Sequence, residues 1–132
     1  MSSALYWSGR MAVSRGLDVV SDPLSFVLVT PDYVFNNSSH LTQADIPTEF
    51  QISECPITGR VLDSDLHLMA DDTAFYDIPP DTVIGGIVLI QNTGEVGTSP
   101  LLIYYSGSDF PITSDGTPFV VQANDALGIL AF

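Results

Sequence analysis

The stretch TVIGGIVLIQNTGEVGTSPLLIYYSG, residues 82–107, decides the fold of this chain. Two apolar runs, Gly86–Ile90 and Leu101–Tyr105, flank a segment rich in glycine, asparagine, serine and proline. Because those residues interrupt regular structure, the pattern predicts a strand, a loop and a second strand. The residues Ile87–Ile90 are all branched and apolar, so this strand has no polar face. We therefore expect it to be covered on both sides, by the domain core and by either a second sheet or a neighbouring subunit.

Further short apolar runs, each bounded by turn residues, predict more strands on both sides of this stretch. They are residues 24–30, 50–56, 57–70, 110–113, 118–122 and 127–132. The pair Asp115-Gly116 lies between two of these runs and predicts that they form a hairpin. Few helix signals occur, and strands do not alternate with helices. About eight short strands of this kind predict an all-β fold, either an antiparallel β-sandwich or a jelly-roll-like barrel.

The chain length of 132 residues fits one domain. We expect residues 17–132 to form a single β domain and residues 1–16 to form an N-terminal arm or a short helix that ends near Gly16. The polar residues 32–47 predict an exposed loop. Cys55 is the sole cysteine and has no disulfide partner within the chain, so we expect its side chain to be a small, buried apolar group.

The charges are distributed unevenly along the chain. Residues 1–16 carry two arginines and no acidic residue, a net charge of +2, whereas residues 17–132 carry 16 acidic residues and one arginine, a net charge of −15. An acidic body of this kind repels phosphate backbones and anionic lipids, so we expect no nucleic-acid partner and no membrane partner. Residues 1–16 also lack the continuous apolar core of a secretory signal.

The N-terminal segment combines aromatic, apolar and cationic side chains, which are the residue types of protein contacts. Only 14% of the residues are charged and the mean hydropathy is positive, so some apolar surface is expected to meet a partner. One interpretation is that the segment packs on its own domain. The other, which we favour, is that it docks on a neighbouring subunit. The predicted contact residues are Tyr6, Trp7, Arg10, Met11 and Arg15.

One acidic cluster has some ligand character. Asp63, Asp65 and His67 share one face of the predicted 57–70 strand, and Asp71 and Asp72 follow it. Residues two apart along a strand are about 6 to 7 Å apart, which is too far for one ion without help from loops. We therefore interpret the cluster as a solvated strand face and expect no metal site. The same carboxylates could also be interpreted as the catalytic pair of a glycosidase, but any acidic protein offers many such pairs, so this interpretation is weaker still.

No other pattern indicates an enzyme or a cofactor. No Gly-x-Ser-x-Gly elbow and no phosphate-binding loop is present, and Gly85-Gly86 is better explained by crowding where a strand begins. Phe75, Tyr76, Tyr104 and Tyr105 could form a stacking platform for a sugar, although core packing explains them better. The sequence therefore predicts a protein without catalytic residues and without cofactors.

Several segments in a shared order resemble a family of short virion proteins encoded beside the head genes of tailed bacteriophages. The matching residues are Ser21-Asp22, Leu28-Val29-Thr30, Asp71-Asp72 with Phe75, Asn92-Thr93-Gly94, Thr98–Leu102, Gln122-Ala123-Asn124 and Gly128-Ile129. They cover a little over half of the chain. Family members usually carry a glycine-rich loop in the region of residues 32–60 and basic residues around the central hairpin, and this chain has neither.

The resemblance implies a non-enzymatic capsid decoration or cement protein. Its expected partners are the major capsid protein and sister copies, most simply in a homotrimer. Its expected location is the capsid exterior of the virion, after synthesis in the host cytoplasm. The alternative is a tail, neck or fibre component, including a receptor-binding knob that uses Tyr76, Tyr104 or Tyr105 against glycans.

Overall fold

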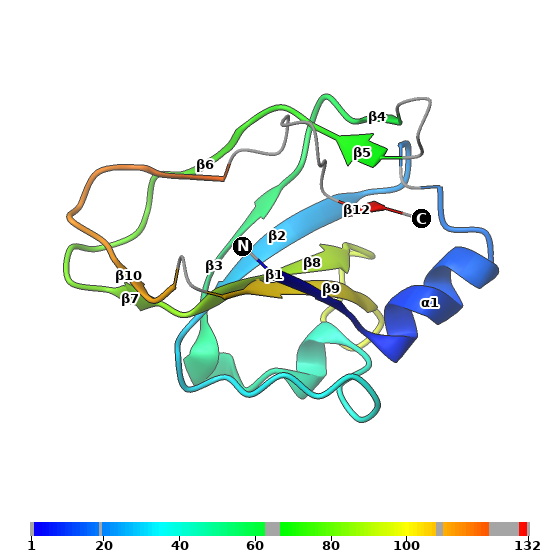
Figure 1. Cartoon of the computed structure of the whole chain (residues 1–132), viewed down its shortest axis with the longest axis horizontal. Helices are drawn as coiled ribbons and strands as arrows, with labels where there is room; N and C mark the ends of the chain where they lie inside the picture. Colours follow the sequence, from blue (N-terminus) through cyan, green and yellow to red (C-terminus); the bar gives the residue numbers. More distant parts are fainter. Residues whose placement is uncertain (1, 19, 63–66, 108–109, 122–129, 132) are drawn as a thin grey trace.

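The computed structural model describes residues 2–18, 20–62, 67–107, 110–121 and 130–131. It shows a mostly β protein with antiparallel sheets and one N-terminal α-helix, arranged like a sandwich (Figure 1). This confirms the all-β expectation. The elements in chain order are β1 (Ser2–Leu5), α1 (Trp7–Ser14), β2 (Leu24–Val29), β3 (Gln51–Pro56), β4 (Val61–Leu62), β5 (His67–Met69), β6 (Thr73–Phe75), β7 (Val83–Ile84), β8 (Gly86–Gln91), β9 (Leu101–Ser106), β10 (Ile112–Thr113), β11 (Phe119–Val121) and β12 (Leu130–Ala131).

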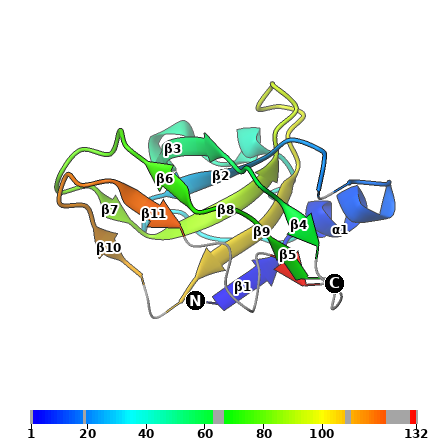
Figure 2. The ribbon, with the colours of Figure 1, turned by 90° about the horizontal axis from the view of Figure 1, so that it is seen from above.

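The main sheet has five strands in the order β1-β9-β8-β2-β3, and every neighbouring pair is antiparallel. The predicted strand, loop and strand of residues 82–107 are therefore present as β8 and β9. Of the smaller sheets, β11-β6 and β12-β5-β4 form a second layer, whereas β10-β7 lies at the end of the main sheet, where β7 leads directly into β8 (Figure 1). Figure 2 shows β4, β5, β6 and β11 lying across the main sheet when it is viewed from above.

The main sheet buries apolar side chains on both faces. Along β2, Phe26 and Leu28 point to one face, and Val27 and Val29 point to the other. One cluster, between the main sheet and the small sheets, consists of Leu24, Phe26, Leu28, Ile57, Ala70, Phe75, Ile78, Ile84, Ile87, Leu89, Leu102, Ile103, Tyr105 and Val121. The other consists of Tyr6, Val27, Val29, Tyr33, Ile46, Val88, Ile90 and Leu101. Each fully buried branched side chain contributes about 1.5–3 kcal/mol.

The second face of the sheet is covered by residues 31–50, the cyan segment below the sheet in Figure 1. Two short 3-10 turns, Gln43–Asp45 and Thr48–Phe50, lie in this segment. Tyr33 and Ile46 are buried against the sheet, at 4% and 1% exposure. The expectation of an exposed loop over residues 32–47 is confirmed for most of its residues, but it is wrong for Tyr33 and Ile46, whose buried side chains cover the second face. The expected cover on both sides of β8 is present, and the chain supplies it itself.

Two predicted strand arrangements are also wrong. The Asp115-Gly116 turn forms, but β10 pairs with β7 and β11 pairs with β6, so no hairpin results. Pro118 has no amide hydrogen to donate to a hairpin ladder, and each arm pairs with a distant strand instead. The predicted 57–70 strand is two strands, β4 and β5, which pair antiparallel with Leu62 opposite Leu68. Of the predicted last strand, Leu130–Ala131 pairs with β5, and the rest lies outside the described residues.

The N-terminal segment forms both an extended strand and a helix. β1 pairs with β9 at the edge of the main sheet, and α1 follows directly. The helix ends as predicted near Gly16, whose φ of 98° lets the Leu17 N–H bond back to the Ala12 carbonyl. A helix of eight residues is marginal alone, so packing on β9 stabilises it.

Gly9 is where α1 approaches β9 most closely. A Cβ at this position would lie 2.5 Å from the Leu102 carbonyl oxygen and 2.9 Å from Leu102 Cα. Both are backbone atoms, so neither side can yield without moving the helix or the strand. Gly85 has the same property, because a Cβ there would lie 2.4 Å from backbone atoms of Pro31.

We predict that Gly9→Ala lowers the free energy of unfolding by about 1–3 kcal/mol, the usual cost of overpacking. Helix propensity alone would raise it by about 1 kcal/mol, so the sign of the change separates the two effects. Urea denaturation measures it. Gly97→Ala is the control, because no atom lies within 4 Å of its added Cβ. A Gly9→Ala protein as stable as the parent would contradict the close packing.

Candidate partner-binding groove

One face of α1 is held against the main sheet. Ser8 and Gly9 are buried, and the Ser8 hydroxyl donates a hydrogen bond of 2.6 Å to the Leu101 carbonyl. Just before the helix, the Tyr6 N–H donates to the Leu102 carbonyl at 3.0 Å. The helix backbone is therefore fixed at several points, and its other face can present side chains in a constant orientation.

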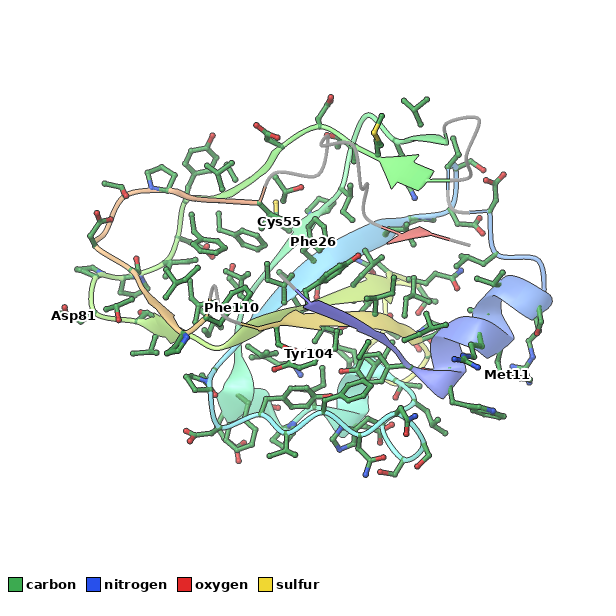
Figure 3. All side chains as sticks on the ribbon, viewed as in Figure 1. Met11, Phe26, Cys55, Asp81, Tyr104 and Phe110 are labelled. Carbon is green, nitrogen blue, oxygen red and sulfur yellow. The ribbon has the colours of Figure 1, made fainter. Side chains whose placement is uncertain are left out.

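The outer face of α1 carries aromatic, apolar and cationic side chains at helical spacing. Trp7, Met11 and Arg15 are each four residues apart and so lie in one row, with Arg10 beside them. The Trp7 side chain is 52% exposed, and both arginines are exposed. Figure 3 shows Met11 at the end of the molecule that α1 forms.

This row borders a groove with a cavity volume of about 580 Å³. That volume lies in the range of about 300–1,000 Å³ typical of ligand clefts, so it can accept several side chains of a partner. The lining residues are Trp7, Ser8, Met11, Ala12, Arg15, Gly16, Leu17, Asp22, Leu41, Thr42, Gln91, Thr98 and Pro100. They come from α1, from the segment after it, from the end of β8, from the β8–β9 loop and from residues 31–50, which we call the cover segment. The groove therefore exists only in the folded chain.

Two guanidinium groups and one carboxylate lie at this groove, since Arg15 and Asp22 line it and Arg10 lies on the same helix. Within the described residues, neither Arg10 nor Arg15 forms an ion pair with a carboxylate. The third arginine, Arg60, lies near Asp18 and Asp22, whose negative charges raise its pKa while burial, the larger effect, lowers it. Both Arg10 and Arg15 lie on α1 or directly after it, in an otherwise acidic chain.

The structure brings four of the five predicted contact residues together and removes one. Trp7, Met11 and Arg15 line the groove, and Arg10 lies on the same helix. Tyr6 is 0% exposed and belongs to the apolar cluster on the second face of the sheet. Including Tyr6 as a partner contact is therefore wrong, because its side chain has no accessible surface to offer.

Tyr6 instead ends a chain of hydrogen bonds that sequence reasoning missed. Its hydroxyl lies 2.6 Å from the Tyr33 hydroxyl, which lies 2.9 Å from Nδ1 of His40. Phe35 and Tyr104 stack beside this chain, with ring centroids 5.5 Å apart. These contacts hold the cover segment against the sheet. Two tyrosines 27 residues apart form no local sequence pattern, so the sequence gave no signal that their hydroxyl groups would be bonded to each other.

The same cover segment also shapes the groove. The Trp7 N–H donates to the Asn37 carbonyl at 2.8 Å, and the Leu101 N–H donates to the Leu41 carbonyl at 3.0 Å. Leu41 and Thr42 then form one wall of the groove. The hydrogen-bonded chain of Tyr6, Tyr33 and His40, the tyrosine–histidine chain, holds the same segment against the sheet and so stabilises this wall.

The four aromatic residues weighed as a sugar platform do not come together as one exposed surface. Phe75 and Tyr105 are buried in the core, and Tyr104 packs under the cover segment. Tyr76 alone is widely exposed, at 79%. The interpretation of these aromatic residues as core is therefore right for Phe75 and Tyr105, and the glycan-binding alternative loses its stacking surface.

The acidic cluster gives no metal centre in the part of the chain that the structure describes. Asp63 and Asp65 lie outside the described residues, and in the remainder no group of three His, Cys, Asp or Glu side chains could hold an ion. Cys55 is half-buried, 3.7 Å from the Ala74 carbonyl oxygen, and burial raises the pKa of its thiol.

Comparison with known proteins gives no family for this chain. No family model, curated protein or solved structure matches it. Among the described residues, no helix is long and apolar enough to cross a membrane.

We predict that Tyr33→Phe lowers the free energy of unfolding by about 1–3 kcal/mol, because the buried Tyr6 hydroxyl is left without a partner. In the double variant Tyr6→Phe/Tyr33→Phe no orphaned hydroxyl remains, so its loss should be smaller than the sum of the single losses. Thermal or urea unfolding measures the cycle. Tyr76→Phe, at an exposed position, is the control and should change nothing. Additive losses would show that the two hydroxyls are not coupled.

We also predict a specific alkaline destabilisation. Burial raises the pKa of Tyr33 to about 12 and raises the pKa of Tyr6 further. An unfolded tyrosine ionises near pH 10, so the stabilisation is fully present below about pH 10 and is lost as the pH rises toward 12. Urea unfolding at about pH 9 and about pH 11 measures this. The Tyr6→Phe/Tyr33→Phe protein should lose less stability over that interval, and an equal loss would contradict the assignment.

Proposed function

We propose that this chain is a non-enzymatic structural protein that works by protein–protein contact, as a decoration or cement protein on a phage capsid lattice. The observation that carries the proposal is the groove. There, Trp7, Met11 and Arg15 present accessible side chains from a helix that the Ser8 hydroxyl and the Tyr6 N–H hold against β9. Aromatic, methionine and arginine side chains are enriched at protein interfaces. The likeness of scattered sequence segments to short phage virion proteins supports the assignment to the capsid exterior.

The arrangement suits a subunit that adds stability to a lattice. The contact side chains lie on a rigid element, so little conformational entropy is lost when a partner binds. Repeated over many copies, weak contacts add through multivalency. The remaining surface is acidic, with a chain net charge of −13, and would keep particles apart in solution. A homotrimer built on bare sheet faces is not part of the proposal, because the chain covers both faces of its main sheet.

The test mixes the purified protein with undecorated capsids assembled from the major capsid protein that the proposal takes as its partner, and sediments the particles. We predict stoichiometric binding by the parent chain and at least tenfold weaker binding by Trp7→Ala/Met11→Ala, since buried aromatic anchors dominate interface energies, at roughly 2 kcal/mol or more each. Deleting residues 2–16 is unsuitable, because it removes the edge strand β1 and the buried Tyr6.

Val34→Ala is the matched control, since Val34 is 76% exposed and lies outside the groove. It should bind as the parent does, and circular dichroism should show that all three proteins are folded. A folded parent chain that fails to sediment with capsids would overturn the proposed function.

A further inference from the structure

We infer that the groove is occupied by the opposite end of a second copy of this chain, in a head-to-tail contact. This inference rests on the proposed function in one respect, which is that the groove is a protein-contact site. The occupant is the acidic tip, defined here as residues 76–81 together with Asp115. Both surfaces of the contact are therefore visible in the structure of one chain.

The acidic tip lies between β6 and β7, at the far end of the molecule from the groove. Figure 3 shows Asp81 at one end of the long axis and Met11 at the other. The tip presents Tyr76, which is 79% exposed, and the exposed pair Pro79-Pro80. Its charges are the carboxylates of Asp77, Asp81 and Asp115, all on exposed residues, and the three arginines of the chain lie elsewhere.

Hydrogen bonds within the chain already fix the shape of the tip. The Asp81 N–H donates to the Ser114 carbonyl at 2.7 Å, and the Ser114 N–H donates to the Thr82 carbonyl at 2.8 Å. These two bonds join the turn before β7 to the turn after β10. The Ser53 hydroxyl also donates to the Asp77 carboxylate, at 2.9 Å. A segment held in this way loses little freedom when it docks, and its prolines have almost no side-chain entropy to lose.

The tip and the groove are complementary in charge and in chemistry. Among the described residues, Arg10 and Arg15 form no ion pair, so the groove end offers two guanidinium groups beside the one groove carboxylate of Asp22, and the tip offers three carboxylates. The groove also offers the exposed ring of Trp7 and the side chain of Met11. Proline-rich segments dock on exposed aromatic rings, and Trp7 offers one such ring in this groove for Pro79-Pro80 to contact.

The position of the two surfaces sets the symmetry of the contact. They lie at opposite ends of the folded chain (Figure 3), so they cannot meet within it, and each copy must use its groove on one neighbour and its tip on another. Such a heterologous contact produces a closed ring when the rotation between copies closes, and a filament when it does not. Two bodies of net charge −13 also repel each other. Physiological salt, with a Debye length of about 8 Å, screens that repulsion more than the direct contacts.

The experiment measures the mass of the full chain in solution by sedimentation velocity at physiological salt, without capsids. The parent should form oligomers whose fraction rises with concentration. Arg10→Asp/Arg15→Asp and Asp77→Arg/Asp81→Arg should each weaken the association at least about tenfold, as expected when close charge pairs become repulsive. The chain that carries all four substitutions restores opposite charges across the contact and should associate again.

Two further proteins complete the design. Asp71→Arg/Asp72→Arg makes the same charge change as the tip variant at exposed positions outside the tip, and should associate as the parent does. Tyr76→Ala removes an exposed ring without changing charge, and should weaken association even if the charge-reversed tip folds poorly. A monomeric parent, equal effects of the two acidic double variants, or a folded fourfold variant that stays monomeric would each overturn the inference.

The outcome is separable from that of the capsid test. A parent chain that is monomeric alone but sediments with capsids would reject the head-to-tail contact and leave the proposed function intact. If substitutions at either end weaken the oligomers of the parent chain, but the parent chain does not bind capsids, the proposed function is rejected and the head-to-tail contact stands.

Discussion

The fold depends on the burial of both faces of β8 and its neighbour β2. Val27 and Val88 on one face, and Phe26 and Leu89 on the other, are 0–2% exposed. An antiparallel sheet normally leaves one face to water, but these strands have no polar face to leave. The chain therefore has to supply two covers. The small sheets form one, and residues 31–50 form the other.

This double cover bears on where the protein could meet a partner. The chain itself covers both broad faces of its main sheet, so we propose that contact falls to the ends of the molecule. At one end, α1 lies on β9 through Gly9 and Ser8 and forms a groove with the cover segment. At the other end, the connection between β6 and β7 forms a fixed acidic turn. The tyrosine–histidine chain links fold and groove, since it holds the segment that provides the groove wall.

Local patterns in the sequence predicted the elements well and their partners poorly. The apolar runs placed β2, β8 and β9, and Gly16 marked the end of the helix, because each signal lies within a few neighbouring residues. Pairing of β10 with β7 joins residues 28 to 30 apart and pairing of β11 with β6 joins residues 44 to 48 apart, and no local rule ranks such pairings above a hairpin.

The same distinction holds for the candidate site. Residue type alone singled out Trp7, Arg10, Met11 and Arg15, because these side chains are typical of interfaces and lie on one helix face. Tyr6 is also of a residue type common at interfaces, but it lies directly before the helix and its side chain is buried in the core. The groove walls could not be predicted, because Leu41, Gln91 and Pro100 reach α1 only through the folded sheet.

Hydrogen–deuterium exchange on the parent chain, compared at low and at high protein concentration, tests the central claim that the ends and not the faces make contact. Amides of β2 and β8 should exchange slowly at both concentrations, since opening them requires unfolding the sheet. Added protection at high concentration should appear in residues 7–16 and 76–82 together. Added protection over residues 31–50 or over β6 and β11, with none at the two ends, would contradict the account.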